Sequence, residues 1–170
     1  MNDELLYEVD EHDGVIGPRA RGVVHGLGLR HRAVHILVFN DLREILLQKR
    51  SRTKDVNPGL WDTSAAGHVD WGESYDDCAV RELGEELGVP SRAPLQFLFK
   101  LPASEQTGWE FVHVYRAVHS GELQLNRGEI DECRWFNPDE LDAWVNGSGI
   151  GLTSSFRLIW QTYRVLEAAG

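Results

Sequence analysis

The sequence predicts an α/β sandwich built on a mixed β-sheet, and three observations lead to this fold class. Segments with strand-like apolar patterns are interleaved along the chain with segments of helical periodicity. One strand segment, residues 32–40, is apolar on both faces, as expected when a sheet is covered on two sides. The 170 residues, of which 42% are hydrophobic, contain no repeat and no linker, so we expect a single domain over 1–170.

Three strands are predicted in the first third of the chain. In the clearest of them Val34, Ile36 and Val38 share one face, and the turn signal Asn40-Asp41 follows. The predicted strands are residues 5–10, 32–40 and 44–49, with a turn-rich segment over 11–18 and a glycine-rich stretch over 22–28 that receives no assignment.

A helix is predicted between Ser74 and Gly88. Ser74 is a suitable N-cap, and the acidic residues of the first turn complement the positive end of the helix dipole. Gly88, with a proline two residues later, ends the helix. Three apolar residues recur at four-residue spacing and should face the core: Ala79, Leu83 and Leu87.

The remaining chain continues the alternation of strands and helices. Asn137 is a strong helix cap, and Pro138 suits the first helical position. The last helix is expected to bury an apolar stripe of Phe156, Ile159, Tyr163 and Leu166. The predicted strands are residues 95–101, 109–118 and 132–136, and the predicted helices are residues 138–145 and 155–168.

Composition and charge restrict the classes of partner. The net charge of −10 argues against duplex nucleic acid, because that binding neutralises phosphates with basic side chains. No apolar run approaches the roughly 20 residues that cross a membrane, and the acidic N-terminus is neither a signal nor a transit peptide. We therefore expect a cytoplasmic protein without a membrane partner. Cys78 and Cys133 are interpreted as small buried hydrophobes. A homodimer is kept as an alternative, although no particular segment of the sequence supports it.

The most informative feature is a group of acidic residues on the helix after Ser74. Glu82, Glu85 and Glu86 stand at i, i+3 and i+4, which places three carboxylates on one helix face. Like charges this close repel one another unless cations lie between them. Hard divalent cations take oxygen ligands, and Mg²⁺ is commonly held by carboxylates together with the phosphates of a substrate. The alternative is a solvated acidic face without a ligand.

The segment Gly67–Val89 resembles the Nudix box, the signature of hydrolases that act on nucleoside diphosphates linked to another moiety. The match covers every fixed position, namely Gly67, Glu73, Arg81, Glu82, Leu83, Glu85, Glu86, Gly88 and Val89. A weaker likeness extends over most of the chain. The resemblance implies a Nudix-type α/β/α sandwich with a mixed sheet, and a small phosphorylated substrate as partner.

The resemblance also implies roles for the acidic residues. By matching position, Glu82, Glu85 and Glu86 would hold Mg²⁺ or Mn²⁺, with Glu85 and Glu86 taking part in catalysis. Cations at this position would neutralise phosphate charge and lower the pKa of an attacking water. Residues of the box with an expected structural role are Gly67, Glu73 and Arg81, the last two as an ion pair that anchors the loop to the helix.

Glu129 is a further candidate for catalysis. It stands six residues before Trp135, where some family members carry an additional glutamate that binds metal or serves as the base. The alternative is a solvated acid at a strand edge.

The region before the box resembles the isopentenyl-diphosphate-isomerase-like branch of the family. In that isomerase, residues at positions like those of His25, His31, His68 and Glu110 hold a second metal. The isomerase also needs a cysteine before the glycine-histidine pair, where this chain has Ala66, and alanine transfers no proton. We therefore expect a hydrolase first, an isomerase second, and a non-catalytic nucleotide-binding domain third.

Contacts to the substrate are predicted on both sides of the box. A basic run at residues 49–54 could reach phosphate, although such a run is also typical of a charged surface. Tryptophans near the box could stack a base or fill the core. The residues assigned to substrate binding are Arg50, Lys54, Trp61 and His68.

Overall fold

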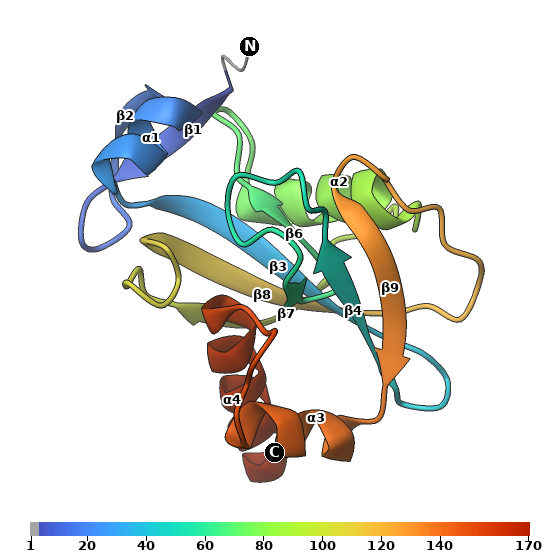
Figure 1. Cartoon of the computed structure of the whole chain (residues 1–170). Helices are drawn as coiled ribbons and strands as arrows, with labels where there is room; N and C mark the ends of the chain where they lie inside the picture. The colour runs from blue at the N-terminus through green and yellow to red at the C-terminus, as the bar shows by residue number, and fades with distance from the viewer. Residues whose placement is uncertain (1–3) are drawn as a thin grey trace.

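The computed structural model describes residues 4–170, and a seven-stranded sheet forms its centre (Figure 1). The strand order is β5-β4-β3-β8-β7, with β6 paired to β3 and β9 paired to β4. The strands of this sheet are β3 (His31–Phe39), β4 (Ile45–Arg50), β5 (Trp61–Asp62), β6 (Ala65–His68), β7 (Gln96–Leu101), β8 (Glu110–Val118) and β9 (Ile130–Phe136).

The sheet is mixed, as the sequence predicts. β3 and β8 run parallel over nine residue pairs, whereas the other pairings of this sheet are antiparallel. β3 is central because it pairs with β8 on one edge, and with β6 and then β4 on the other. Its side chains are buried on both faces, which explains the continuous apolar run in its sequence.

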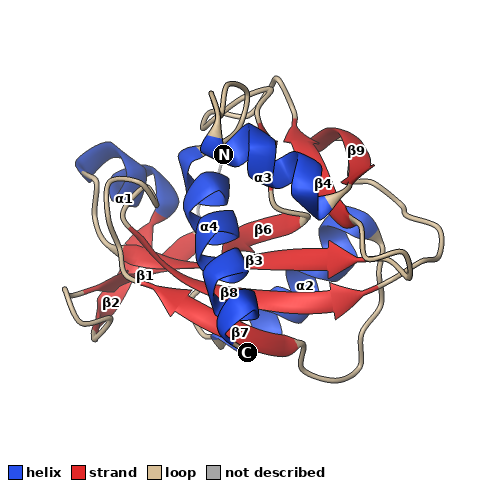
Figure 2. Cartoon of the chain, turned by 90° about the horizontal axis from the view of Figure 1, so that it is seen from below, coloured by secondary structure: helices blue, strands red, loops and turns tan. Residues whose placement is uncertain are grey.

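Helices cover the two faces and produce the α/β/α sandwich that was predicted (Figures 1 and 2). Helix α2 (Tyr75–Leu87) packs on one face, where Val34, Ile36 and Val38 meet the predicted stripe of α2. Helices α3 (Pro138–Asn146) and α4 (Ser154–Ala169) pack on the other face. In Figure 2, α4 crosses in front of β3, β8 and β7, and α2 lies behind them.

The predicted helix caps are present. The Ser74 side chain accepts a hydrogen bond from the backbone N–H of Asp77, and Gly88 ends α2 in the left-handed conformation. Asn137 caps α3, with Pro138 at its first position. The predicted stripe of α4 is wrong at Leu166, which is 49% exposed, whereas Phe156 and Ile159 are buried.

The N-terminal region differs most from prediction. The turn predicted over 11–18 is shorter, because Val15–Ala20 forms strand β2 and pairs with β1 (Leu5–Val9). Pro18 is tolerated there because β2, among the described strands, pairs only with β1 and is therefore an edge strand. The unassigned glycine-rich stretch is helix α1 (Arg21–Leu27), which buries Val24 and ends at the left-handed Gly28. We call these three elements, residues 5–27, the N-terminal module.

A buried ion cluster attaches the N-terminal module to the sheet. Asp13, in the turn between β1 and β2, accepts hydrogen bonds from Arg32 Nε at 2.7 Å and from the Tyr75 hydroxyl at 2.9 Å, and it also pairs with Lys100. Although burial opposes it, these contacts hold the pKa of the Asp13 carboxyl below its usual range. The Asp13 cluster therefore joins the module to β3, α2 and β7.

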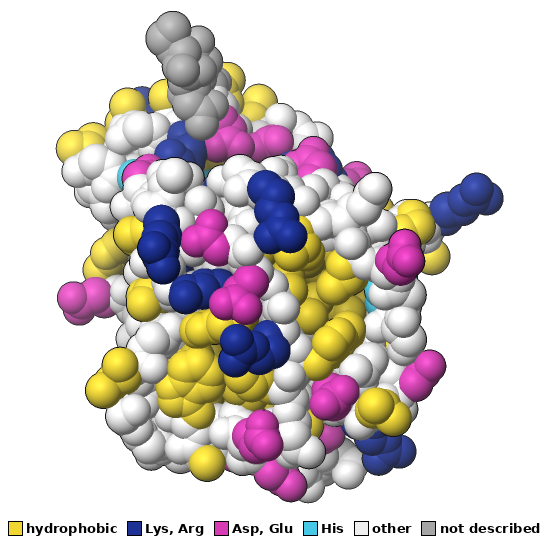
Figure 3. Space-filling view, turned by 45° about the vertical axis from the view of Figure 1, so that its right-hand side comes forward, with side chains coloured by type: hydrophobic (Ala, Val, Ile, Leu, Met, Phe, Trp, Pro, Cys, Tyr) yellow, Lys and Arg dark blue, Asp and Glu magenta, His cyan; other side chains and the backbone are white. Residues whose placement is uncertain are grey.

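The surface carries charges of both signs. In the view of Figure 3, Lys and Arg side chains alternate with Asp and Glu side chains, and hydrophobic side chains gather over the lower half. Among the described residues, no helix is long and apolar enough to cross a membrane.

Candidate active site

A cleft of about 860 Å³ lies between the N-terminal module, β6, the C-terminal half of α2 and the start of α4. It is the place where the predicted site residues meet. The predicted residues that line it are His25, His31, Arg50, Lys54, Gly67, His68, Arg81, Glu82, Glu85, Glu86, Glu110 and Glu129.

Gly67 lets α2 approach β6 closely. A Cβ atom at this position would lie 2.1 Å from Cδ and Oε1 of Glu82, a distance that side-chain atoms do not tolerate. The glycine of the box is therefore required by the carboxylate of Glu82, which occupies the space beside the β6 backbone.

Arg81 organises the acidic residues around it. Its guanidinium donates to both carboxylate oxygens of Glu73, at 2.6 and 3.0 Å, in a bidentate pair. Another nitrogen of the same group donates to Glu82 at 2.9 Å and to Glu85 at 3.1 Å. The predicted Glu73–Arg81 pair is thus present, and it connects the loop before α2 to the carboxylates that face the cleft.

Glu86 is the most deeply placed of the three carboxylates. Its Oε1 accepts hydrogen bonds from the backbone N–H of Ala66 at 2.9 Å and from Gln48 Nε2 at 3.1 Å. Burial raises the pKa of Glu86 to about 7, although these two hydrogen bonds favour the ionised form. Burial and the nearby Glu86 carboxylate likewise raise the pKa of Glu82 to about 8, despite Arg81.

Glu129 reaches the same cleft from the loop before β9. Its carboxylate pairs with the Lys54 ammonium group, which comes from the loop between β4 and β5. Arg50 lies 4.0 Å from Asp62 and donates to the backbone carbonyl of Val56. Both predicted phosphate-binding cations therefore line the cleft and already have acidic or carbonyl partners.

Trp61 lies outside the lining of the cleft, unlike the other residues assigned to substrate binding. It packs edge-on against Phe136 at 5.6 Å, with the Arg134 guanidinium over its ring at 5.5 Å. The reason is strand alternation: Asp62, the next residue of β5, lines the cleft, so Trp61 points to the other face.

Three histidines form a second group in the cleft. Ligand atoms of His25, His31 and His68 lie within 4.8 Å of one another, which is close enough to hold one metal ion. Glu110 Oε2 lies 3.1 Å from His68 Nε2 and 3.4 Å from His31 Nε2. These residues come from α1, β3, β6 and the first position of β8, so the fold assembles the group from four separate segments.

The protonation of this group suits a cation. His31 Nδ1 lies 2.8 Å from the Leu29 carbonyl and must donate to it, so the neutral ring has a bare Nε2 beside the Glu110 carboxylate. Within the described chain, this buried Nε2 has no hydrogen-bond partner. Burial and His68 lower the pKa of His25 to about 4. Three imidazoles beside one carboxylate are metal ligands in type and arrangement.

Sequence reasoning missed several residues that shape the cleft. Gln48 supports Glu86, and its signal was a polar side chain at a buried position of an otherwise apolar strand. Arg21 binds Asp55 through two hydrogen bonds of 3.1 Å and joins α1 to the loop that carries Lys54. No local pattern predicts this second contact, because the residues are 34 positions apart.

Comparisons with known proteins agree with this geometry. The family model of the NUDIX domain matches residues 29–151. An isopentenyl-diphosphate Delta-isomerase of Photorhabdus laumondii is 35% identical over 161 residues, covering 92% of this chain and 90% of the relative. An uncharacterised Nudix hydrolase of Pseudomonas aeruginosa is 38% identical over 139 residues, covering 80% of each chain.

A solved structure has the same fold. The crystal structure of DR0079 from Deinococcus radiodurans superposes with a TM-score of 0.82 at 26% identity, covering 94% of this chain and 98% of that one. Membership of the Nudix family, together with the fold, supports hydrolysis of pyrophosphate bonds, and proteins of this family generally use divalent metal ions. The intact box lies on the wall of the cleft, and the chain belongs to the Nudix family.

Proposed function

We propose that this protein is a Mg²⁺- or Mn²⁺-dependent hydrolase that cleaves the diphosphate linkage of a nucleoside diphosphate derivative with water. The observation that carries the proposal is the convergence of Glu82, Glu85 and Glu86 on one wall of the cleft. Glu86 is buried and Glu82 partly so; burial first, and then neighbouring carboxylates, raise the pKa of both, as expected for acidic groups that await a cation.

The donor set fits a hard divalent cation. Glu82 and Glu86 offer carboxylate oxygens at the bottom of the cleft, and Glu85, with 57% of its side chain exposed, offers oxygens toward solvent. When bound there, the metal would neutralise phosphate charge and activate a water molecule. Arg81 keeps Glu82 and Glu85 in place, and Gln48 with the Ala66 amide keeps Glu86 in place.

The basic and acidic side chains of the opposite wall complete the proposal. Lys54 and Arg50 would bind phosphate oxygens of the substrate, each by exchanging an acidic partner for a phosphate. Once released from Lys54, Glu129 would orient the attacking water. The proton of this water would pass to Glu129, Glu85 or Glu86.

An isomerase is the second candidate, because the histidine group and the Photorhabdus relative both favour it. We propose that a second metal is held by His25, His31, His68 and Glu110. These residues offer it three nitrogen ligands and one oxygen ligand. Ala66 weighs against isomerisation, since its methyl side chain exchanges no proton with an alkene carbon.

A substrate screen separates these functions. The protein is incubated with Mg²⁺ or Mn²⁺ and nucleoside diphosphates, sugar nucleotides, ADP-ribose, dinucleoside polyphosphates and isopentenyl diphosphate, in ¹⁸O-labelled water. The proposal predicts metal-dependent cleavage of at least one nucleotide, with one ¹⁸O atom in a phosphate product. Conversion of isopentenyl diphosphate without label would favour the isomerase. Tight nucleotide binding without turnover would favour a binding domain.

A further inference from the structure

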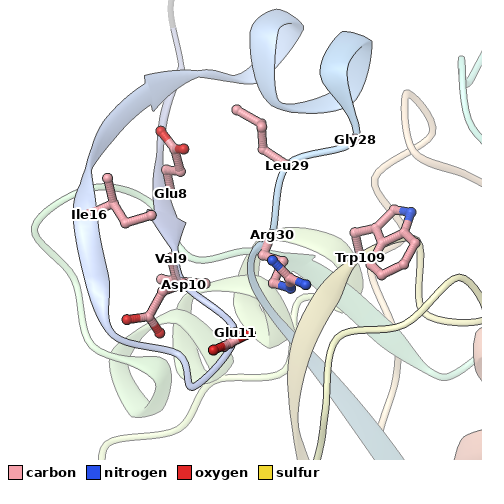
Figure 4. A pocket seen from close by; sticks show the side chains of 9 residues that line it. All are labelled: Glu8, Val9, Asp10, Glu11, Ile16, Gly28, Leu29, Arg30 and Trp109. Carbon is pink, nitrogen blue, oxygen red and sulfur yellow. The ribbon is translucent and has the colours of Figure 1, made fainter.

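We propose that a second pocket, which adjoins the cleft at Trp109, binds the nucleobase of the substrate. The inference rests on the proposed function, because the phosphates of the same molecule would lie in the cleft. The pocket has a volume of about 480 Å³ and lies between the β1–β2 hairpin, the segment after α1 and Trp109 (Figure 4).

The two cavities share a border at two residues. Gly28 and Trp109 line both the cleft and the smaller pocket. A Cβ atom at residue 28 would lie 3.8 Å from Cδ1 of Trp109, so the edge of the indole faces the bare backbone of Gly28. Because Gly28 has no side chain, the border of the two cavities beside the Trp109 indole is not filled.

Trp109 has an unusual backbone conformation. Its φ of 64° lies in the left-handed region, which bulky residues rarely occupy unless the surrounding structure enforces it. Here the Trp109 N–H donates to the Ser104 carbonyl at 2.7 Å, and the Trp109 carbonyl accepts from the His31 N–H at 3.1 Å. Strain of this kind is concentrated at functional sites, and it holds the indole, 39% exposed, at the border of the cavities.

The lining of the pocket selects for an uncharged aromatic group. Trp109 and Arg30 both line the pocket, and their indole and guanidinium are planar groups on which a base can stack. Asp10 and Glu11 add carboxylate oxygens, which accept hydrogen bonds from base amino groups and repel phosphate. Asp10 offers Oδ2, because its Oδ1 accepts from the backbone N–H groups of His12 and Gly14, and Glu8 is paired with Arg19. The cleft supplies Arg50, Lys54 and the proposed metal for the phosphates, whereas the carboxylates of the pocket repel them, so the base would lie in the pocket and the phosphates toward α2.

The kinetic test compares Trp109→Ala, Trp109→Phe and the control Trp71→Ala. Trp71 is similarly exposed, at 42%, but packs on Tyr7 and lines neither cavity. With the best nucleotide substrate, Trp109→Ala should raise KM between about 5-fold and about 150-fold with little change in kcat. Trp109→Phe should restore most of the affinity, and Trp71→Ala should behave as the wild type. The inhibition constant of inorganic pyrophosphate, which has no base, should be the same in all four proteins.

A second measurement needs neither metal nor turnover. Cytidine and adenosine are titrated into the protein while the indole N–H signals are followed by NMR, with the Trp109 signal identified by its loss in Trp109→Phe. The inference predicts that the Trp109 signal shifts and the Trp71 signal does not. If no diphosphate is hydrolysed, the proposed function fails, and this titration still decides the subsite.

Two results would overturn the inference. One is an equal loss of affinity for inorganic pyrophosphate and for the nucleotide in Trp109→Ala, which would mean that the substitution only disturbs Glu110 next to it. The other is an unchanged Trp109 signal at saturating nucleoside.

Discussion

The two ends of the cleft that forms the candidate active site are built in opposite ways. The carboxylate end takes Glu82, Glu85 and Glu86 from one turn of helix α2. The histidine end takes His25, His31, His68 and Glu110 from four separate elements. One end therefore depends on the geometry of a single helix and its contact with β6, and the other depends on how the N-terminal module is attached to the sheet.

The comparison shows that the two ends can be damaged separately. Gly67 and Arg81 set the carboxylate end, whereas the Asp13 cluster and the Arg21–Asp55 pair fix α1, and with it His25. A substitution in one set should change one end and spare the other.

Among substitutions outside the three carboxylates, the largest effect is expected from Gly67→Ala. The new Cβ atom would displace the Glu82 carboxylate, and a shift of about 1 Å in a catalytic group can cost about 100-fold in rate. We expect kcat to fall by at least that factor while metal binding by the histidines is kept. Gly17→Ala is the matched control, because nothing lies within 4 Å of its Cβ position. Wild-type kcat in Gly67→Ala would show that Glu82 need not occupy this place.

Asp13→Asn should break the attachment of the N-terminal module. It leaves Arg32 and Lys100 without their buried carboxylate, which should lower the free energy of unfolding by about 2 kcal/mol. This loss is smaller than the loss expected for a fully buried pair, because Lys100 is partly exposed. Urea denaturation measures the change. Glu167→Gln, at an exposed pair with Arg164, should cost about 0.5 kcal/mol or less.

The effect of Asp13 should also depend on pH. Because its pKa is lower in the folded than in the unfolded protein, the Asp13 carboxylate stabilises the fold above the unfolded value of about 3.9, and the contribution is lost as pH falls through the folded value. The difference between wild type and Asp13→Asn should therefore be constant near neutral pH and shrink below about pH 4. A difference that grows on acidification would contradict the assignment.

The smallest effect is expected from His31→Gln, which removes one ligand from the histidine end. We expect the affinity of that end for Zn²⁺ or Mn²⁺ to fall at least about tenfold, as measured by calorimetry. His12→Gln is the control, since the His12 side chain is 84% exposed and is not a member of the cluster. Equal affinities in the two variants would mean that the histidines bind no metal.

The same contrast explains what the sequence predicts and what it does not. The helix of the box, its caps and its carboxylate face follow from local spacing, and the two-sided burial of β3 follows from its apolar run. Helix α1 could not be predicted, because Gly22 and Gly26 disfavour helix and the burial of Val24 maintains it.

Long-range contacts account for the rest. The histidine end was accessible only through resemblance, since neither spacing nor periodicity joins residue 25 to residue 110. Lys54 and Glu129 are 75 positions apart, and nothing in either segment indicates their pairing. The direction of Trp61, away from the cleft and onto Phe136 and the core, depends on a two-residue strand that the pattern does not reveal.

The most direct test of the central claim is the turnover of Glu85→Gln and Glu86→Gln on the best nucleotide substrate with saturating Mg²⁺. Each variant keeps the size of the side chain and removes one charge, and Glu140→Gln on the surface of α3 is the control. If the carboxylate end carries the metal that activates water, several kcal/mol of stabilisation are lost, and phosphate release should fall about 1,000-fold in both variants and remain unchanged in the control. Wild-type turnover in both Glu85→Gln and Glu86→Gln would contradict the account.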